Sequence, residues 1–130
     1  MSEVLAKEKK QKVCIVEDDP SIQEMYKVKL LQEGYEVITA NDGEEGYEVI
    51  SSERPDIALI DIGMPKMNGI ELMKALYDDP ELSKIPVVVL TNYDDESIVN
   101  QTKGLQSRFY LVKALFTPSG VARIVREVLH

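Results

Sequence analysis

The chain has 130 residues, of which 44% are hydrophobic and 29% charged, as expected for one globular domain. Its formal net charge of −8 disfavours nucleic acid and anionic membranes as direct partners, because both attract cation-rich surfaces. We find no apolar run of membrane-spanning length and no signal segment at the N-terminus. We therefore expect a cytoplasmic protein with a flexible leader at residues 1–11 and a folded domain at 12–130.

The first predicted elements are a strand at residues 13–16 and a helix that begins at Asp19-Pro20. The strand is apolar throughout, so we expect it to be buried on both faces, with Cys14 as a buried hydrophobe. The apolar residues of the helix are expected on one face: Ile22, Met25, Tyr26 and Leu30. Residues 35–39 alternate more, which is typical of an edge strand.

Three further apolar runs, at residues 57–60, 86–90 and 109–112, are predicted to be buried strands. Helical patterns lie between them. One predicted helix face consists of Ile70, Met73, Leu76 and Tyr77. Residues 95–103 give the weakest helical pattern, and the last helix is predicted to begin at Thr117-Pro118. Five strands that alternate with five helices indicate an α/β doubly wound parallel sheet.

Polar side chains follow four of the five predicted strands. Glu17 and Asp18 follow the first strand, Asp61 the third, Thr91 the fourth and Lys113 the fifth. Each one alone is equally well explained as part of a turn or a helix cap. Ligands of open α/β sheets bind beyond the carboxyl ends of the strands, however, so together these residues predict a functional site.

The predicted site is rich in carboxylates, which repel one another unless a cation or a proton lies between them. Oxygen ligands favour Mg²⁺, with Mn²⁺ as the alternative, and the absence of nearby histidine or cysteine disfavours zinc. A carboxylate beside such a cation can act as a nucleophile toward phosphorus. Thr91 and Lys113 would then bind the remaining phosphoryl oxygens.

With these residues in place, the sequence resembles the bacterial response-regulator receiver domain over residues 12–129. The matching segments are residues 14–20 (CIVEDDP), 61–69 (DIGMPKMNG), 89–91 (VLT) and 110–113 (YLVK). The resemblance implies a flavodoxin-like fold with strand order 2-1-3-4-5. It also implies a phosphorylation-activated switch, similar to single-domain chemotaxis regulators, that belongs to a two-component system or phosphorelay.

The resemblance also implies a role for each site residue. Asp61 is expected to be the phosphoacceptor, Asp18 a direct metal ligand and Glu17 a ligand that acts largely through water. The backbone carbonyl of Gly63 is expected to complete the metal ligands. Thr91 is expected to supply a hydroxyl that moves to the phosphoryl group, and Lys113 a cation that pairs with that group. Tyr110 is expected to be an aromatic switch. A packing role for Tyr110 is the alternative.

Three positions depart from the family pattern. Ala114 replaces the usual proline after Lys113, so we expect a trans peptide bond there, or a strained cis bond that the surrounding loop retains. Asn92 replaces a small residue and narrows access to the site. Tyr93 is positioned to shield the acyl phosphate from water, so we hypothesise slow autodephosphorylation.

The expected partners are a histidine kinase or a phosphotransfer protein, together with an unidentified downstream protein. We expect a stand-alone regulator that is monomeric, or dimeric when phosphorylated, and that is no enzyme for external substrates. Three alternatives remain. A Mg²⁺-dependent phosphohydrolase is disfavoured because Gly63 occupies the position of its second acid, and a flavin-binding module because the loop after the first strand is acidic. A pseudo-receiver that binds partners without phosphorylation stays open because of Ala114 and Asn92.

Overall fold

The computed structural model describes residues 10–64, 67–92, 96–113 and 116–130, without the side chains of residues 96–98. Its centre is a parallel sheet of five strands in the order β2-β1-β3-β4-β5. The strands are β1 (Lys12–Val16), β2 (Glu36–Ala40), β3 (Ile57–Asp61), β4 (Val87–Thr91) and β5 (Ser107–Val112). The fold class and strand order predicted above are thereby confirmed.

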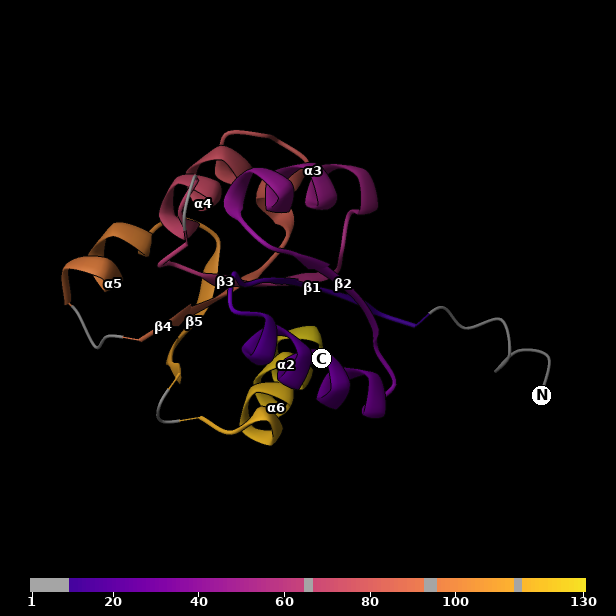
Figure 1. The fold of residues 1–130 in the computed structure, drawn as a ribbon. Coiled ribbons are helices and arrows are strands. Elements are labelled where there is room, and N and C mark those ends of the chain that lie inside the picture. Colours follow the sequence, from indigo (N-terminus) through magenta and orange to yellow (C-terminus); the bar gives the residue numbers. More distant parts are fainter. Residues whose placement is uncertain (1–9, 65–66, 93–95, 114–115) are drawn as a thin grey trace.

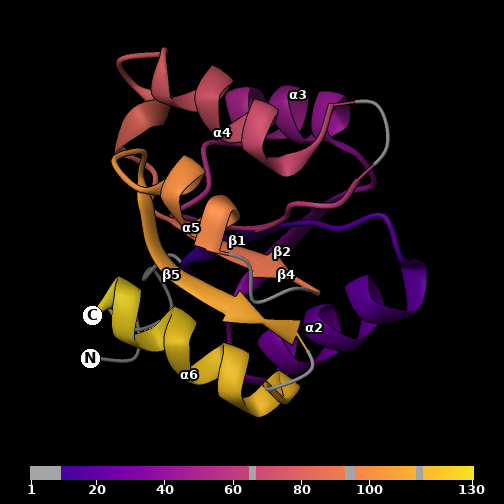
Figure 2. The same cartoon turned by 90° about the vertical axis from the view of Figure 1, so that its left-hand side faces the viewer.

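Helices cover both faces of the sheet (Figure 1). One face carries α2 (Pro20–Gln32) and α6 (Pro118–Leu129). The other carries α3 (Gly43–Glu53), α4 (Gly69–Tyr77) and α5 (Glu96–Thr102), with a short 3₁₀ helix at Leu82–Lys84. Figure 2 shows the same layers from the side, with α6 next to α2. Helical crossovers join strands that are consecutive in the chain, and because all pairs are parallel the five strands end at the same edge of the sheet.

Two predicted helix starts are confirmed. The Asp19 side chain accepts hydrogen bonds from the backbone N–H groups of Ser21, at 2.9 Å, and Ile22, at 3.2 Å, and Pro20 is the first residue of α2. The Thr117 hydroxyl accepts one from Gly120, at 3.1 Å, with Pro118 next in the chain. These caps satisfy donors that a helix leaves without partners, and proline removes one donor from the first turn.

The sheet separates two hydrophobic clusters. On the side of α2 and α6, Ile15 and Leu59 pack with Tyr26, Leu30 and Val125. On the other side, Cys14 and Ile60 pack with helical residues that include Ile50, Leu72 and Met73. Every residue of β3 and β4 is buried, because helices cover both faces of these central strands. The prediction for Cys14 is confirmed: its side chain is fully buried.

Three apolar residues do not follow the buried strand or the shared helix face predicted for them. Phe109 lies on β5, which is an edge strand, and it is 36% exposed. Met25 is 44% exposed although Tyr26 and Leu30 of the same helix are buried, and Tyr77 is 50% exposed at the end of α4. Each residue has an apolar neighbour one position along the chain that faces the core, so the apolar pattern alone did not separate the two faces.

Candidate functional site

Three acids meet where β1 and β3 end. One carboxylate oxygen each from Glu17, Asp18 and Asp61 lies within 4.8 Å of the other two. Glu17 is fully buried and Asp61 is 3% exposed, whereas Asp18 is exposed. The cluster therefore has a buried floor and one side open to solvent. Such an arrangement is costly unless a cation or a proton offsets the repulsion.

Backbone contacts fix the segment that bears Glu17 and Asp18. The N–H of Glu17 donates to the carbonyl of Ala40 at 3.1 Å, which continues the β1–β2 ladder by one residue. The cap at Asp19 then directs the chain into α2 directly after Asp18. Both acids are thus held between a strand end and a helix start, which limits their backbone freedom.

The segment after Asp61 turns sharply back on itself. The N–H of Gly63 donates to Asp61 Oδ1 at 3.2 Å, and the N–H of Gly69 donates to the carbonyl of Ile62 at 3.0 Å. A β-carbon at position 69 would lie 2.3 Å from the carbonyl oxygen of Asp61, so only glycine fits this close approach. The loop between β3 and α4 is closed at its base, next to the Asp61 carboxylate.

Lys113 provides the positive charge of the site. Its ammonium donates a hydrogen bond to Glu17 Oε1 and lies 3.3 Å from Asp61 Oδ2. Its side chain is 8% exposed, so little water screens these contacts. Thr91 is 2% exposed at the end of β4, one residue beyond Leu90, which pairs with Asp61 in the sheet. The structure thus brings to one edge the groups that follow four strands.

The electrostatics of the two buried acids differ. Burial raises the pKa of Glu17 to about 8, with a further contribution from its hydrogen bond to Asp61 that Lys113 opposes. Burial also acts to raise the pKa of Asp61, but the hydrogen bond with Glu17, the Lys113 ammonium and the Gly63 N–H outweigh it and lower the pKa. The two coupled acids therefore differ in direction: the pKa of Glu17 is raised and that of Asp61 is lowered.

The acids fit a hard divalent cation. All three donors are carboxylate oxygens, which Mg²⁺ prefers. Glu17 Oε2 is buried and has no hydrogen-bond partner among the described residues, and burying such an oxygen without a partner costs free energy. A cation, with its waters, would complete the bonding of this oxygen. The exposed side at Asp18 leaves room for water or a phosphoryl group.

The remaining predicted residues lie around this cluster. Gly63 is exposed next to Asp61, and Asn92 is exposed after β4. Tyr110 lies half-buried on β5 and packs against the hydrophobic cluster on the α3 and α4 side of the sheet. Tyr93 and Ala114 lie outside the described residues, as do residues 1–9. The isomer of the Lys113–Ala114 bond, the shielding by Tyr93 and the leader therefore stay predictions.

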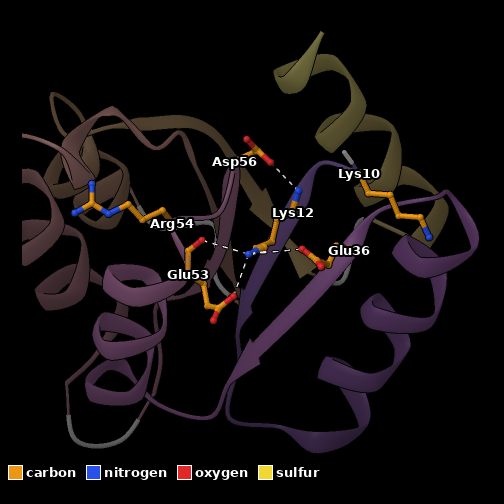
Figure 3. A pocket seen from close by; sticks show the side chains of 6 residues that line it. All are labelled: Lys10, Lys12, Glu36, Glu53, Arg54 and Asp56. Carbon is orange, nitrogen blue, oxygen red and sulfur yellow. Dashed lines mark hydrogen bonds and ion pairs between the residues drawn. The ribbon is translucent and has the colours of Figure 1, made fainter. Parts of the chain in front are cut away.

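A polar pocket lies at the edge of the sheet opposite the acid cluster (Figure 3). It has a volume of about 510 Å³, and Lys12 at the start of β1 is its centre. The Lys12 ammonium contacts Glu53 at 3.0 Å and Glu36 at 3.6 Å, and its backbone N–H donates to Asp56 at 2.7 Å. Lys12 is thus paired with the acids around it. The pocket lies where strands begin, and none of its described lining residues has a buried oxygen without a hydrogen-bond partner.

Comparison with known proteins agrees with this geometry. Residues 13–125 match the response-regulator receiver domain family. The chain belongs to that family. Over 104 residues this receiver domain is 38% identical to protein PilH of Pseudomonas aeruginosa, a match that covers 78% of the chain and 84% of PilH. A probable transcriptional regulator, ycf27 of Guillardia theta, is 36% identical over 95% of the chain, which covers 47% of ycf27.

Among solved structures, the chemotaxis response regulator CheY4 of Vibrio cholerae is similar to the whole fold. The TM-score is 0.86 at 31% identity, and the match covers 93% of this receiver domain and 100% of the CheY4 chain. The receiver domain spans about half the length of several curated relatives, including ycf27 and the regulator PhoP of Bacillus subtilis. No helix in the described part of the chain is long and apolar enough to cross a bilayer.

Three features around the site were not assigned from the sequence: a capping box, Gln23 and Gly43. Asn68 and Glu71 form a capping box that starts α4, and their spacing of three residues is its known signature. Gln23 donates to oxygens of two loops, and Gly43 contacts the loop after β3. Neither Gln23 nor Gly43 is marked by a local sequence pattern, because their partners are distant in the sequence.

Proposed function

We propose that this receiver domain is a phosphorylation-activated signalling switch that accepts a phosphoryl group on Asp61. The observation that supports this most is the meeting of Asp61 with two further acids and with the Lys113 ammonium at one edge of the sheet. Signalling through phosphorylation is the general function of receiver domains, and the role of each residue of this site is our proposal.

The proposed cation is Mg²⁺, with Mn²⁺ as the alternative. Asp18 and Asp61 would bind it directly, Glu17 largely through water, and Gly63 through its backbone carbonyl. When bound, the cation supplies positive charge that neutralises the acids and the incoming phosphoryl oxygens. The unpartnered Glu17 Oε2 and the exposed Asp18 support this choice of ligands.

Asp61 is proposed to attack as the ionised carboxylate that its lowered pKa provides. A bond forms between a carboxylate oxygen and phosphorus, and the bond between phosphorus and the donor's imidazole nitrogen breaks. The donor nitrogen keeps the electron pair. Lys113, already 3.3 Å from Asp61 Oδ2, then pairs with a phosphoryl oxygen, and the Thr91 hydroxyl donates to another.

The proposed output is a change of packing at β5. Movement of the Thr91 hydroxyl toward the phosphoryl group vacates space beside it, and Tyr110 turns inward. Tyr110 is half-buried on an edge strand, and its strand partner Val89 lies two residues before Thr91, so the two side chains are close in the sheet. A local change of charge would thereby bias a surface that partners contact.

We further propose a histidine kinase or a phosphotransfer protein as phosphoryl donor, and a protein as the downstream target, with no direct contact to nucleic acid or membrane. The domain promotes its own phosphorylation and slow autodephosphorylation, and it turns over no external substrate. Residues 12–130 are proposed to act as a stand-alone cytoplasmic regulator, monomeric or dimeric when phosphorylated. The similarity to CheY4 and to PilH supports a response-regulator role for this receiver domain.

Intact-protein mass spectrometry tests the proposal. Incubation with acetyl phosphate and Mg²⁺ is expected to add one phosphoryl mass to the wild type. No added phosphoryl mass is expected on Asp61→Asn, or on the wild type in the presence of EDTA. A wild-type protein that gains no mass would contradict the proposal and favour the pseudo-receiver.

If Tyr93→Ala leaves the half-life of the phosphorylated form unchanged, the shielding hypothesis fails.

A further inference from the structure

The loop between β2 and α3 contributes no residue to the acid cluster, yet it contacts both loops that do. The relevant segment is residues 40–43, from Ala40 at the end of β2 to Gly43 at the start of α3. On one side it contacts the segment that bears Glu17, and on the other it contacts the loop after Asp61.

The first contact depends on the Gln23 side chain of α2. Its amide nitrogen Nε2 lies 2.9 Å from the carbonyl oxygen of Glu17, 3.2 Å from that of Ala40 and 3.1 Å from Asn41 Oδ1. One partly buried amide thus joins the end of β1 to the end of β2. With the bond from the Glu17 N–H to Ala40, both backbone polar groups of Glu17 are tied to residues 40–43 directly or through Gln23.

The second contact is a close approach of two backbones. A β-carbon at Gly43 would lie 2.0 Å from the carbonyl oxygen of Met67 and 2.7 Å from its carbonyl carbon. Met67 belongs to the loop after Asp61, whose base is closed by the bond from Gly69 to Ile62. Because rigid backbone lies on both sides, any side chain at position 43 must displace the loop, the helix or both.

These two contacts connect both sides of the site to residues 40–43. The segment that bears Glu17 and Asp18 and the loop that bears Gly63 have separate origins, at the ends of β1 and β3, and each rests on residues 40–43. We propose that Gln23 and Gly43 are positioning residues that hold the two ligand-bearing loops at the separation that cation binding requires. This inference rests on the cation site of the proposed function.

The test compares Gln23→Met and Gly43→Ala with the wild type by NMR titration with Mg²⁺. Gln23→Met keeps the length of the side chain and removes its donors. Residues that orient metal ligands typically contribute about tenfold or more to affinity, so each variant is expected to weaken Mg²⁺ binding about tenfold. In the cation-free protein, the Gly63 amide resonance is expected to shift in Gly43→Ala.

Gly46→Ala is the matched control on the same helix. Its β-carbon would lie 3.0 Å from side-chain atoms of Leu72 and Val16, so it strains the core without contacting the loop after Asp61. It is expected to lower the melting temperature while Mg²⁺ affinity stays within about twofold of wild type. If Gly46→Ala weakens Mg²⁺ binding as much as Gly43→Ala does, general destabilisation explains both and the inference is overturned.

The inference is also overturned if Gln23→Met and Gly43→Ala bind Mg²⁺ as the wild type does. If Gly43→Ala does not fold, Gln23→Met decides alone, since it removes no packing volume. Failure of the proposed function is distinguishable, because in that case the wild type itself does not bind Mg²⁺. The Gly63 resonance of the cation-free variants then still shows whether residues 40–43 position the loop.

Discussion

Replacing Gly69 with alanine is predicted to destabilise the protein strongly, although alanine is the better helix former. A β-carbon at position 69 would lie 2.3 Å from the carbonyl oxygen of Asp61 and 2.7 Å from the α-carbon of Ile62. Ordinary contacts of this kind begin near 3.4 Å, so the atoms must separate by about 1 Å. Neither side can yield cheaply, because one is the end of a central strand and the other the first turn of α4.

Overpacking of this kind typically costs 1–3 kcal/mol, and a clash between backbones places Gly69→Ala at about 3 kcal/mol. At about 2.1 cal/mol/K per residue, unfolding of 130 residues has an entropy of about 0.27 kcal/mol/K. The melting temperature is therefore expected to fall by about 11 °C. Thermal denaturation followed by circular dichroism measures this directly, at fixed protein concentration and without divalent cations.

Gly120→Ala is the control, because it makes the same change in the first turn of α6. Its β-carbon would meet Phe116 and Thr117 at 3.5 Å, which is ordinary van der Waals contact. This variant is expected to gain about 0.5–1 kcal/mol from the lower entropy of its unfolded chain. A Gly69→Ala protein that melts within about 2 °C of the wild type would refute the close approach deduced for Asp61.

Three further predictions concern other parts of the fold. Asn68→Ala removes the capping box of α4 and is expected to cost about 1 kcal/mol, or about 4 °C in melting temperature; an unchanged melting temperature would contradict this role. Burial raises the pKa of Cys14 to about 12, so its thiol should not react with a disulfide reagent at pH 8 until denaturant is added, and rapid labelling of the native protein would contradict its burial. Hydrogen bonds from the N–H groups of Leu82 and Glu81 lower the pKa of Asp79, so Asp79→Ala is expected to destabilise the protein at neutral pH. The difference in stability between this variant and the wild type should shrink as pH falls through the lowered pKa. A difference that persists in acid would show that the charge of Asp79 is not the cause.

Much of the fold was predictable because its central strands are buried on both faces. Such strands are continuous apolar runs, as at β3, and the residue after each run marks the site edge. Asp19 and Thr117 were predictable as caps because a cap and its helix are adjacent in the sequence. The outer elements were harder: Phe109 and Tyr77 are apolar residues that the topology leaves on the surface.

The site was predictable in its composition but not in its pairing. The sequence indicates which residues follow strands, and parallel strands place them at one edge. It does not indicate that Lys113 contacts Glu17 as well as Asp61, or that one oxygen of Glu17 lacks a partner within the part of the chain that the structure describes. Gln23 and Gly43 depend on contacts across three loops, and such contacts follow only from the assembled fold.

Chemical trapping at the acceptor residue tests the central claim most directly. The protein is treated with acetyl phosphate and Mg²⁺ and then with borohydride, which reduces an aspartyl phosphate to homoserine. Peptide mass spectrometry is predicted to find homoserine at position 61 of the wild type and at no other acid of the cluster. Homoserine at position 18 in place of 61, or a wild-type protein with no reduced residue, would contradict the account.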